Sequence, residues 1–200
     1  MEARTATNNG LRRVVGIVAL LNLGYFGLEF VVALAIGSVS LFADSVDFLE
    51  DASVNLLIVL ALGWSARNRA RLGMVLAGIL LVPALATIWT AWEKFSVPTP
   101  PSPIPLSLAG LGALAVNLSC AYMLARYRDH AGSLTRAAFL SARNDALANI
   151  AIILAGATTA FIWPSAWPDL LVGIGIALMN ADAAREVWGA AREERRGAMV

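Results

Sequence analysis

The stretch FADSVDFLEDASVN, residues 42–55, places three aspartates, Asp44, Asp47 and Asp51, at spacings of three and four in a largely apolar part of the chain. On a helix, at about 100° per residue, the three aspartates and Asn55 fall within roughly 80° of arc and form one stripe. An ionised carboxylate in hydrocarbon costs at least about 2.5–3.5 kcal/mol. Three of them on one membrane helix therefore predict a positively charged ligand.

The composition of the whole chain indicates a membrane protein. Of its 200 residues, 58% are apolar and only 14% are charged, and the mean hydropathy is +0.70. A soluble domain usually has about 25% charged residues, and this chain could not cover itself with polar surface. The net charge of +1 argues neither for nor against a nucleic-acid partner, and no basic cluster interleaved with aromatic residues suggests one.

The chain has few cysteine or histidine residues that could bind a soft metal ion. Cys120 is the only cysteine and His130 the only histidine. A disulfide framework and a multi-cysteine metal site are therefore excluded. Any metal site in this chain must be built mostly from oxygen atoms.

Six charge-poor blocks follow one another, each close to or beyond the roughly 20 residues that cross about 30 Å of hydrocarbon. They run from Val14 to about Gly37, from Ser40 to Ser65, from Leu72 to Trp92, from Pro105 to Ala125, from Arg136 to Trp163 and from Leu170 to about Val187. We expect an all-α polytopic membrane protein with an N-terminal segment (residues 1–12), a six-helix transmembrane domain (13–189) and a short tail (190–200).

Basic residues fix the expected orientation. Arginines gather before the first block, in the second and fourth connections, and in the tail: Arg4, Arg12, Arg13, Arg67, Arg69, Arg71, Arg126, Arg128, Arg136, Arg185, Arg192, Arg195 and Arg196. By the positive-inside rule both termini are cytoplasmic, in a multi-pass protein of the inner (cell) membrane. Tryptophans at the opposite ends, Trp89, Trp92, Trp163 and Trp167, are typical of a membrane interface.

The fifth block has a second set of polar residues. Ser141, Asp145 and Asn149 stand at successive i, i+4 positions, with Asn144 beside them. Pairing with Arg143 is the alternative reading for Asp145, but side chains two residues apart do not face each other on a helix.

The two acidic sets have matching depths. Asp145 lies about ten residues from the cytoplasmic start of its block, and Asp47 and Asp51 lie about ten residues into theirs. We therefore expect the two sets to meet near the middle of the membrane.

Four further polar residues lie inside the blocks. For Asn22 and Asn117 we expect hydrogen bonds between helices rather than metal ligation. Glu29 lies near the outer end, where we expect it to contact water. Glu50 points about 100° away from Asp51, which predicts either a place behind the metal ligands or a contact with a neighbouring helix.

The segment GSVSLFADSVDFLEDASVNLLIVLAL resembles the second-helix signature of the cation diffusion facilitator family. Members of that family export divalent metals and have six transmembrane helices. The family's second-helix pair falls on Asp47 and Asp51, and Asp44 matches a further acidic position. Its fifth-helix His-x-x-x-Asp pair falls on Ser141 and Asp145. NLGYFGLEF, AVNLSCAYML and GSLTRAAFLSARNDALAN extend the resemblance over roughly residues 11 to 190.

Two departures from the family pattern stand out. The fifth-helix histidine is replaced by Ser141, with Asn144 the nearest alternative ligand. The usual cytoplasmic metal-binding domain is also not expected, because the chain ends about a dozen residues after the sixth block. A homodimer, which that domain normally supports, remains an open alternative.

The resemblance implies a divalent metal efflux transporter without enzymatic activity and without a cofactor other than its cargo. Asp47, Asp51 and Asp145 are the expected metal ligands, completed by Ser141 or Asn144, with Asp44 as a further ligand or part of the exit path. Zn²⁺ is the first expectation. Cd²⁺, Co²⁺, Fe²⁺ and Mn²⁺ are alternatives, because oxygen in place of imidazole favours harder cations. Metal binding displaces protons from its ligands, so the resemblance also implies exchange of metal for protons.

Two other classes of function stand as alternatives. One is an integral-membrane enzyme with an aspartate-bound metal, and the other is a non-transporting subunit whose carboxylates pair with a partner's basic residues. Neither predicts matched acidic positions on the second and fifth blocks.

Overall fold

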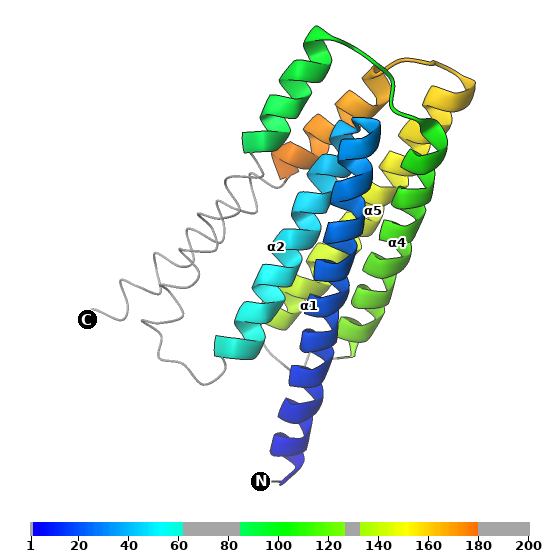
Figure 1. Cartoon of the computed structure of the whole chain (residues 1–200). Helices are drawn as coiled ribbons and strands as arrows, with labels where there is room; N and C mark the ends of the chain where they lie inside the picture. The colour runs from blue at the N-terminus through cyan, green and yellow to red at the C-terminus, as the bar shows by residue number, and fades with distance from the viewer. Residues whose placement is uncertain (1, 62–84, 127–132, 180–200) are drawn as a thin grey trace.

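The computed structural model describes residues 2–61, 85–126 and 133–179 (Figure 1). Four long helices occur in these ranges: α1 (Glu2–Ile36), α2 (Val39–Ala61), α4 (Pro103–Ala125) and α5 (Ser133–Phe161). The described ranges also contain a helical segment at 85–96 and the helix Trp167–Met179. We call Trp167–Met179 the last helix, because it is the last one that the structure describes. The described ranges contain no strand. The expected all-α class is therefore confirmed.

Except at the start of α1, the helix bounds lie within a few residues of the expected blocks wherever the structure describes them. α1 begins already at Glu2, so the expected N-terminal segment 1–12 continues into the first span without a break. Parts of the third and sixth blocks, together with His130 and the tail 190–200, lie outside the described residues.

Three of the described helical stretches are long and apolar enough to cross a membrane: Gly10–Ile36, Pro103–Ala125 and Ser141–Phe161. α2 has a sufficient length of 23 residues. It is not one of the three because its sequence includes four acidic residues, Asp44, Asp47, Glu50 and Asp51. The acidic stripe thus lies on the least hydrocarbon-compatible of the four long helices.

The four long helices form a bundle, in which α1 packs mainly against α2, and α4 mainly against α5 (Figure 1). The segment 85–96 and the helix Trp167–Met179 lie at the end of the bundle that has the α1–α2 turn. The distribution of arginines predicts that this end faces outward, and we call it the outer end. Exposed tryptophans, Trp89, Trp92, Trp163 and Trp167, lie there, as an interfacial belt requires.

The α1–α2 turn is very short. Gly37 and Ser38 alone separate the two helices, and Gly37 has a φ of 63°, a left-handed conformation that glycine adopts without steric cost. The amide of Ser38 returns to the carbonyl of Ala33 at 3.0 Å. α1 and α2 are therefore held as a tight antiparallel pair.

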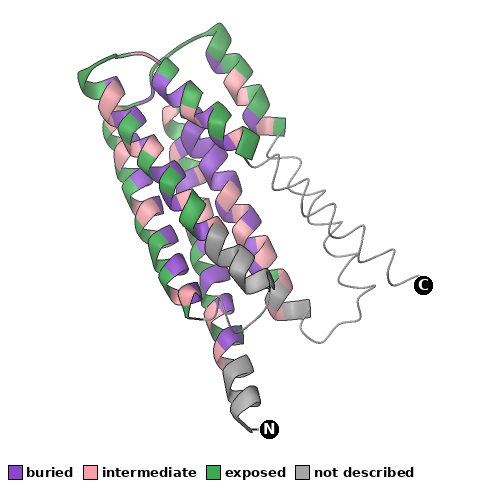
Figure 2. Cartoon of the chain, turned by 180° about the vertical axis from the view of Figure 1, so that it is seen from behind, coloured by how far each residue is buried: buried purple, intermediate pink, exposed green. Residues whose placement is uncertain are grey.

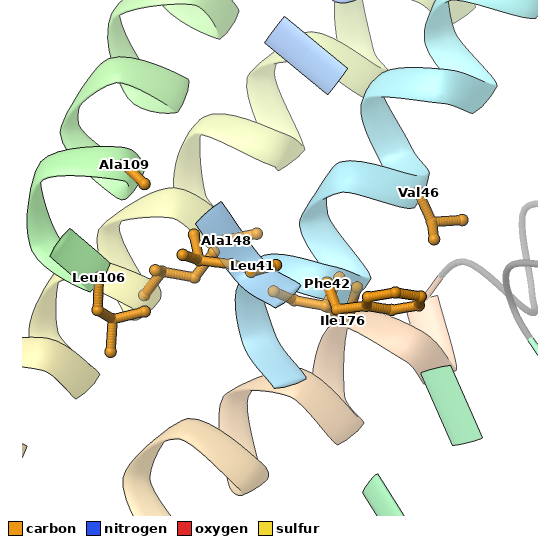
Figure 3. Packing of buried hydrophobic residues seen from close by; sticks show 10 residues of the cluster. Leu41, Phe42, Val46, Leu106, Ala109, Ala148 and Ile176 are labelled. Carbon is orange, nitrogen blue, oxygen red and sulfur yellow. The ribbon is translucent and has the colours of Figure 1, made fainter. Parts of the chain in front are cut away.

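Two apolar clusters fill the bundle, and buried residues face its interior while exposed ones face outward (Figure 2). The outer cluster is drawn from α1, α2, α4, α5 and the last helix (Figure 3): Ala33, Leu41, Phe42, Ala43, Val46, Leu106, Ala109, Ala148, Ile152 and Ile176. The inner cluster comes from α1, α4 and α5: Leu11, Val15, Val18, Cys120, Ala121, Leu124 and Ala142. Large apolar side chains on the outside, such as Leu20 and Leu154, suit contact with lipid.

Gly173 lies close against the backbone at the start of α2. A Cβ at this position would lie 2.8 Å from the amide nitrogen of Ser40 and 2.8 Å from the carbonyl carbon of Val39. Such a contact with backbone cannot be relieved by a rotamer change, so the last helix would have to move away from α2.

We expect Gly173→Ala to destabilise the protein by about 1–3 kcal/mol, the usual cost of overpacking. Thermal unfolding in detergent measures the effect. Gly175→Ala is the matched control, because a Cβ at Gly175 meets no atom within 4 Å. Equal stability of the two variants would contradict the prediction.

Candidate metal centre

A cavity of about 120 Å³ lies between α2, α5 and the inner end of the last helix. It is lined by Asp47, Glu50, Asp51, Ser141, Asn144, Asp145 and Met179. Five of the six residues that the sequence predicts for the site therefore line one cavity, and Asp44 does not. At 1.5 Å per residue, Asp47 and Asp51 lie about 12–18 Å from the outer end of α2, near the middle of a hydrocarbon layer of about 30 Å.

Ser141 connects the acidic residues of the two helices. Its hydroxyl lies 3.0 Å from Oδ1 of Asp51 on α2 and 3.5 Å from Oδ2 of Asp145 on its own helix. A serine hydroxyl has one proton to donate, so it can donate to only one carboxylate at a time. Asn22 of α1 approaches the other oxygen of Asp51 at 3.5 Å. Three helices thus meet at Asp51.

Negative charge dominates the surroundings of Asp47. The charges that act on it are those of Asp145, Asp44, Glu50 and Asp51. Arg143 is exposed, and its guanidinium donates to the side-chain oxygen of Asn144 at 3.4 Å. Among the described residues, the lining of this cavity has several carboxylates and neither lysine nor arginine, which favours a cationic ligand.

The carboxylates around the cavity stand apart from one another. In the part of the chain that the structure describes, no three His, Cys, Asp or Glu side chains are arranged so that they could hold a metal ion. Like charges repel strongly in a poorly solvated interior. A cation that entered the cavity would therefore have to pull Asp47, Asp51 and Asp145 toward itself.

Asp44 belongs to a separate polar layer, one turn closer to the outer end. It is fully buried, and its Oδ2 accepts a hydrogen bond of 2.6 Å from the amide of Asn149. The side-chain oxygen of Asn149 in turn accepts from Asn117 at 3.0 Å. The expected hydrogen bonding of Asn117 between helices is confirmed, and α2, α5 and α4 are joined in this layer.

The surroundings of Glu29 differ from those that the sequence predicted. This residue was expected to contact water, but it is fully buried, and it lies close enough to Asp44 for their charges to act on each other. Both of its carboxylate oxygens, and Oδ1 of Asp44, have no hydrogen-bond donor among the described residues. The tight packing of α1 against α2 excludes the outer water that the sequence position suggested. Two carboxyl groups can form a hydrogen bond only if one of them has a proton.

Glu50 is the lining residue that the sequence interpretation placed elsewhere. Its offset of about 100° from Asp51 predicted a place behind the ligands or a helix contact, but Glu50 lines the cavity itself. It is only three residues from Asp47, about 60° around the helix. An ionisable side chain inside a membrane span is by default a candidate for function. That rule, applied without the angular argument, would have found Glu50.

We expect Asn149→Leu to destabilise the protein by about 1.5–3 kcal/mol, because it removes the donor from a buried charged acceptor. Thermal unfolding in detergent measures the loss. Asp44→Asn in the same chain should recover part of it, since the uncompensated charge is then gone. Leu147→Ala, an exposed site on α5, is the control, and an Asn149→Leu protein as stable as this control would contradict the prediction.

One comparison with known proteins bears on this geometry. The model of the family described as the cation efflux transmembrane domain matches residues 15–191. Apart from Val14, the match covers all six expected blocks, and it includes every described residue that lines the cavity.

Proposed function

The chain belongs to the cation efflux family, whose members transport divalent metal cations across membranes, and from this premise we propose that it exports a divalent metal in exchange for protons through the α2–α5 cavity. One observation supports the proposal most. Acidic residues from two different helices line the same mid-membrane cavity, and Ser141 connects them. A cavity of this kind gives a divalent cation oxygen ligands from both helices.

The proposed ligands are Asp47, Asp51 and Asp145, with Ser141 or Asn144 as the fourth. Four groups suit a tetrahedral ion, and Zn²⁺ accepts carboxylate oxygens at about 2.0–2.2 Å. We therefore propose Zn²⁺ as the main cargo. Because the site has no imidazole, Mn²⁺, Fe²⁺, Co²⁺ and Cd²⁺ are the competitors.

Protons are the proposed counter-ions. Carboxylates must be deprotonated to bind a metal, so metal binding releases protons and protonation releases metal. The buried carboxyl pair of Glu29 and Asp44, one turn outward of the cavity, is a second place where a proton can reside between the metal site and the outer end. With both termini cytoplasmic in the inner membrane, an inward proton gradient would drive metal out of the cell.

The two alternative classes gain no support from the cavity. A lipid- or phosphate-modifying enzyme would need basic residues toward its anionic substrate, and the lining residues include neither lysine nor arginine. A non-transporting subunit would not need carboxylates on two helices around one cavity.

Metal uptake into everted vesicles tests the proposal. The assay compares Zn²⁺, Cd²⁺, Co²⁺, Fe²⁺ and Mn²⁺, each with and without a pH gradient that is acidic inside. We expect gradient-dependent uptake, fastest for Zn²⁺. Uptake that is insensitive to the gradient would refute the proton exchange, and no uptake of any of the five metals would refute the transport.

A further inference from the structure

A polar cluster at the outer end joins three parts of the chain. It consists of Gly37, Ser38, Val39 and Ser40 in the α1–α2 turn, Lys94 in the segment 85–96, and Asp169 in the last helix, and we call it the outer junction. None of these residues lines the α2–α5 cavity.

Asp169 is the centre of the outer junction. It is fully buried, and its carboxylate accepts four hydrogen bonds from the start of α2. Its Oδ1 accepts from the hydroxyls of Ser38 and Ser40, both at 2.6 Å, and from the amide of Ser40 at 3.2 Å. Its Oδ2 accepts from the amide of Val39 at 2.8 Å. A residue of the last helix thus supplies the cap that the N-terminus of α2 requires.

Lys94 ties the segment 85–96 to the same place. Its ammonium donates to the carbonyl of Gly37 in the α1–α2 turn. Burial lowers the pKa of Lys94, and the nearby Asp169 carboxylate acts in the opposite direction. The positive and negative members of the junction therefore lie close enough to influence each other.

The last helix is held unevenly along its length. Near Asp169 it touches α2 closely, through Gly173 and through a small apolar cluster of Val39, Ala166 and Leu170. Toward Met179, a groove of about 410 Å³ separates it from α5. The outer junction is therefore where this helix is fixed to the bundle.

Apolar side chains lie between the depth of the cavity and the outer end. Phe42 and Val46 come before Asp47 on α2, and Ile176 comes before Met179 on the last helix, so all three lie outward of these cavity residues, and all three belong to the outer apolar cluster (Figure 3). Phe42 also lines a hollow of about 600 Å³ between the α1–α2 turn and the segment 85–96. These three apolar side chains thus lie at depths between the cavity and the outer hollow.

We propose that the outer junction is the outer gate of the transporter. While it is formed, it holds the last helix against α2 and keeps the apolar seal closed. When it is released, the last helix separates from α2 at this end and the cavity opens outward. The inference rests on the proposed transport function for its purpose, but its geometry can be tested without transport. Release is feasible because the adjoining segments at 96–101 and 160–164 are largely exposed, so that water can replace the lost hydrogen bonds.

Thiol labelling in intact cells tests the gate directly. The parent protein has Cys120→Ala, which removes the only cysteine, and Val46→Cys, which places a reporter in the seal at a position that is 3% exposed. We expect slow labelling by a membrane-impermeant maleimide in the parent. Asp169→Asn should raise the rate at least about tenfold, because it removes the charge that the four donors bind.

Two further variants make the labelling result decisive. Ser38→Ala with Ser40→Ala removes two donors and leaves the carboxylate, and should raise the rate in the same direction by a smaller factor. Glu93→Gln neutralises an exposed carboxylate at the same end and should leave the rate at the parent level. Parent-level labelling in both junction variants would overturn the proposal, as would an equal rise in Glu93→Gln.

Crosslinking tests whether the gate must open during transport. Val39→Cys with Ala166→Cys, in the Cys120→Ala background, places two thiols in the small apolar cluster, where a short reducible bifunctional reagent can join them. We expect metal uptake to stop in the joined protein and to return on reduction. Undiminished uptake in the joined protein would show that the junction is a permanent pivot and would overturn the gate. If the reduced protein transports no metal, the proposed function fails, and labelling of Val46→Cys alone decides the gate.

Discussion

Asp51→Asn is expected to reduce metal export at least about 100-fold, beyond the 10–100-fold that the loss of a residue supporting a metal ligand usually costs. Asp51 is where α1, α2 and α5 meet, because it lies 3.0 Å from Ser141 and 3.5 Å from Asn22. The amide of the variant keeps the size of the side chain and can accept one hydrogen bond, but it has no charge to offer a cation. Initial rates of Zn²⁺ uptake into everted vesicles measure the loss.

Asp145→Asn should have the same effect from the other helix, since it removes the acidic partner across the cavity. Glu93→Gln is the matched control, because it removes a carboxylate that is exposed and lies outside the cavity. Comparable amounts of each variant in the membrane exclude a folding defect. Unchanged export in both aspartate variants would favour a non-transporting subunit.

Ser141→His is expected to shift the cargo preference toward Zn²⁺ and Cd²⁺, and away from Mn²⁺, by about tenfold or more. Imidazole nitrogen suits Zn²⁺, whereas oxygen ligands suit Mn²⁺. Position 141 is well placed for this change, because its side chain reaches both Asp51 and Asp145. Competition between Zn²⁺ and Mn²⁺ in the vesicle assay measures the ratio.

Ser141→Ala separates the two roles that the serine could have. If Ser141 only positions the carboxylates, the alanine variant should slow the transport of all metals by a similar factor. If its oxygen binds the metal, the alanine variant should change the ratio between metals as well. A histidine variant with the parent's Zn²⁺ to Mn²⁺ ratio would show that position 141 does not face the cargo.

The helical architecture could be predicted from the sequence because the apolar blocks are long and their ends are marked. The proline-rich segment before Pro103 and the glycine at position 37 fall where helices begin and end. The packing of the helices could not be predicted in the same way. Asp169 was an unremarkable acidic residue after the fifth block, and only the folded chain places it at the N-terminus of α2, about 130 residues earlier in the chain.

The site was predictable in its membership but not in its boundaries. Asp47, Asp51 and Asp145 could be assigned to a common depth because residue counts along two antiparallel helices translate directly into depth. The position of a residue around its own helix was a weaker guide. It predicted Glu50 behind the ligands or against a neighbouring helix and Glu29 near water, whereas Glu50 lines the cavity and Glu29 is buried, because no single helix encodes the packing of its neighbours.

The two-residue connection at Gly37 and Ser38 also has a consequence for biogenesis. Each aspartate at the centre of a helix adds about 2.5–3.5 kcal/mol to the cost of insertion by the translocon, and α2 has its four acidic residues in its outer and middle turns. α1 has a long apolar stretch, Gly10–Ile36, and can enter the bilayer by itself. Because only two residues connect the helices, α2 cannot stay outside the bilayer once α1 has entered it. The second helix of this protein therefore enters the membrane as one arm of a hairpin with the first, and the residues proposed to bind the cargo depend on their neighbour for delivery to that depth.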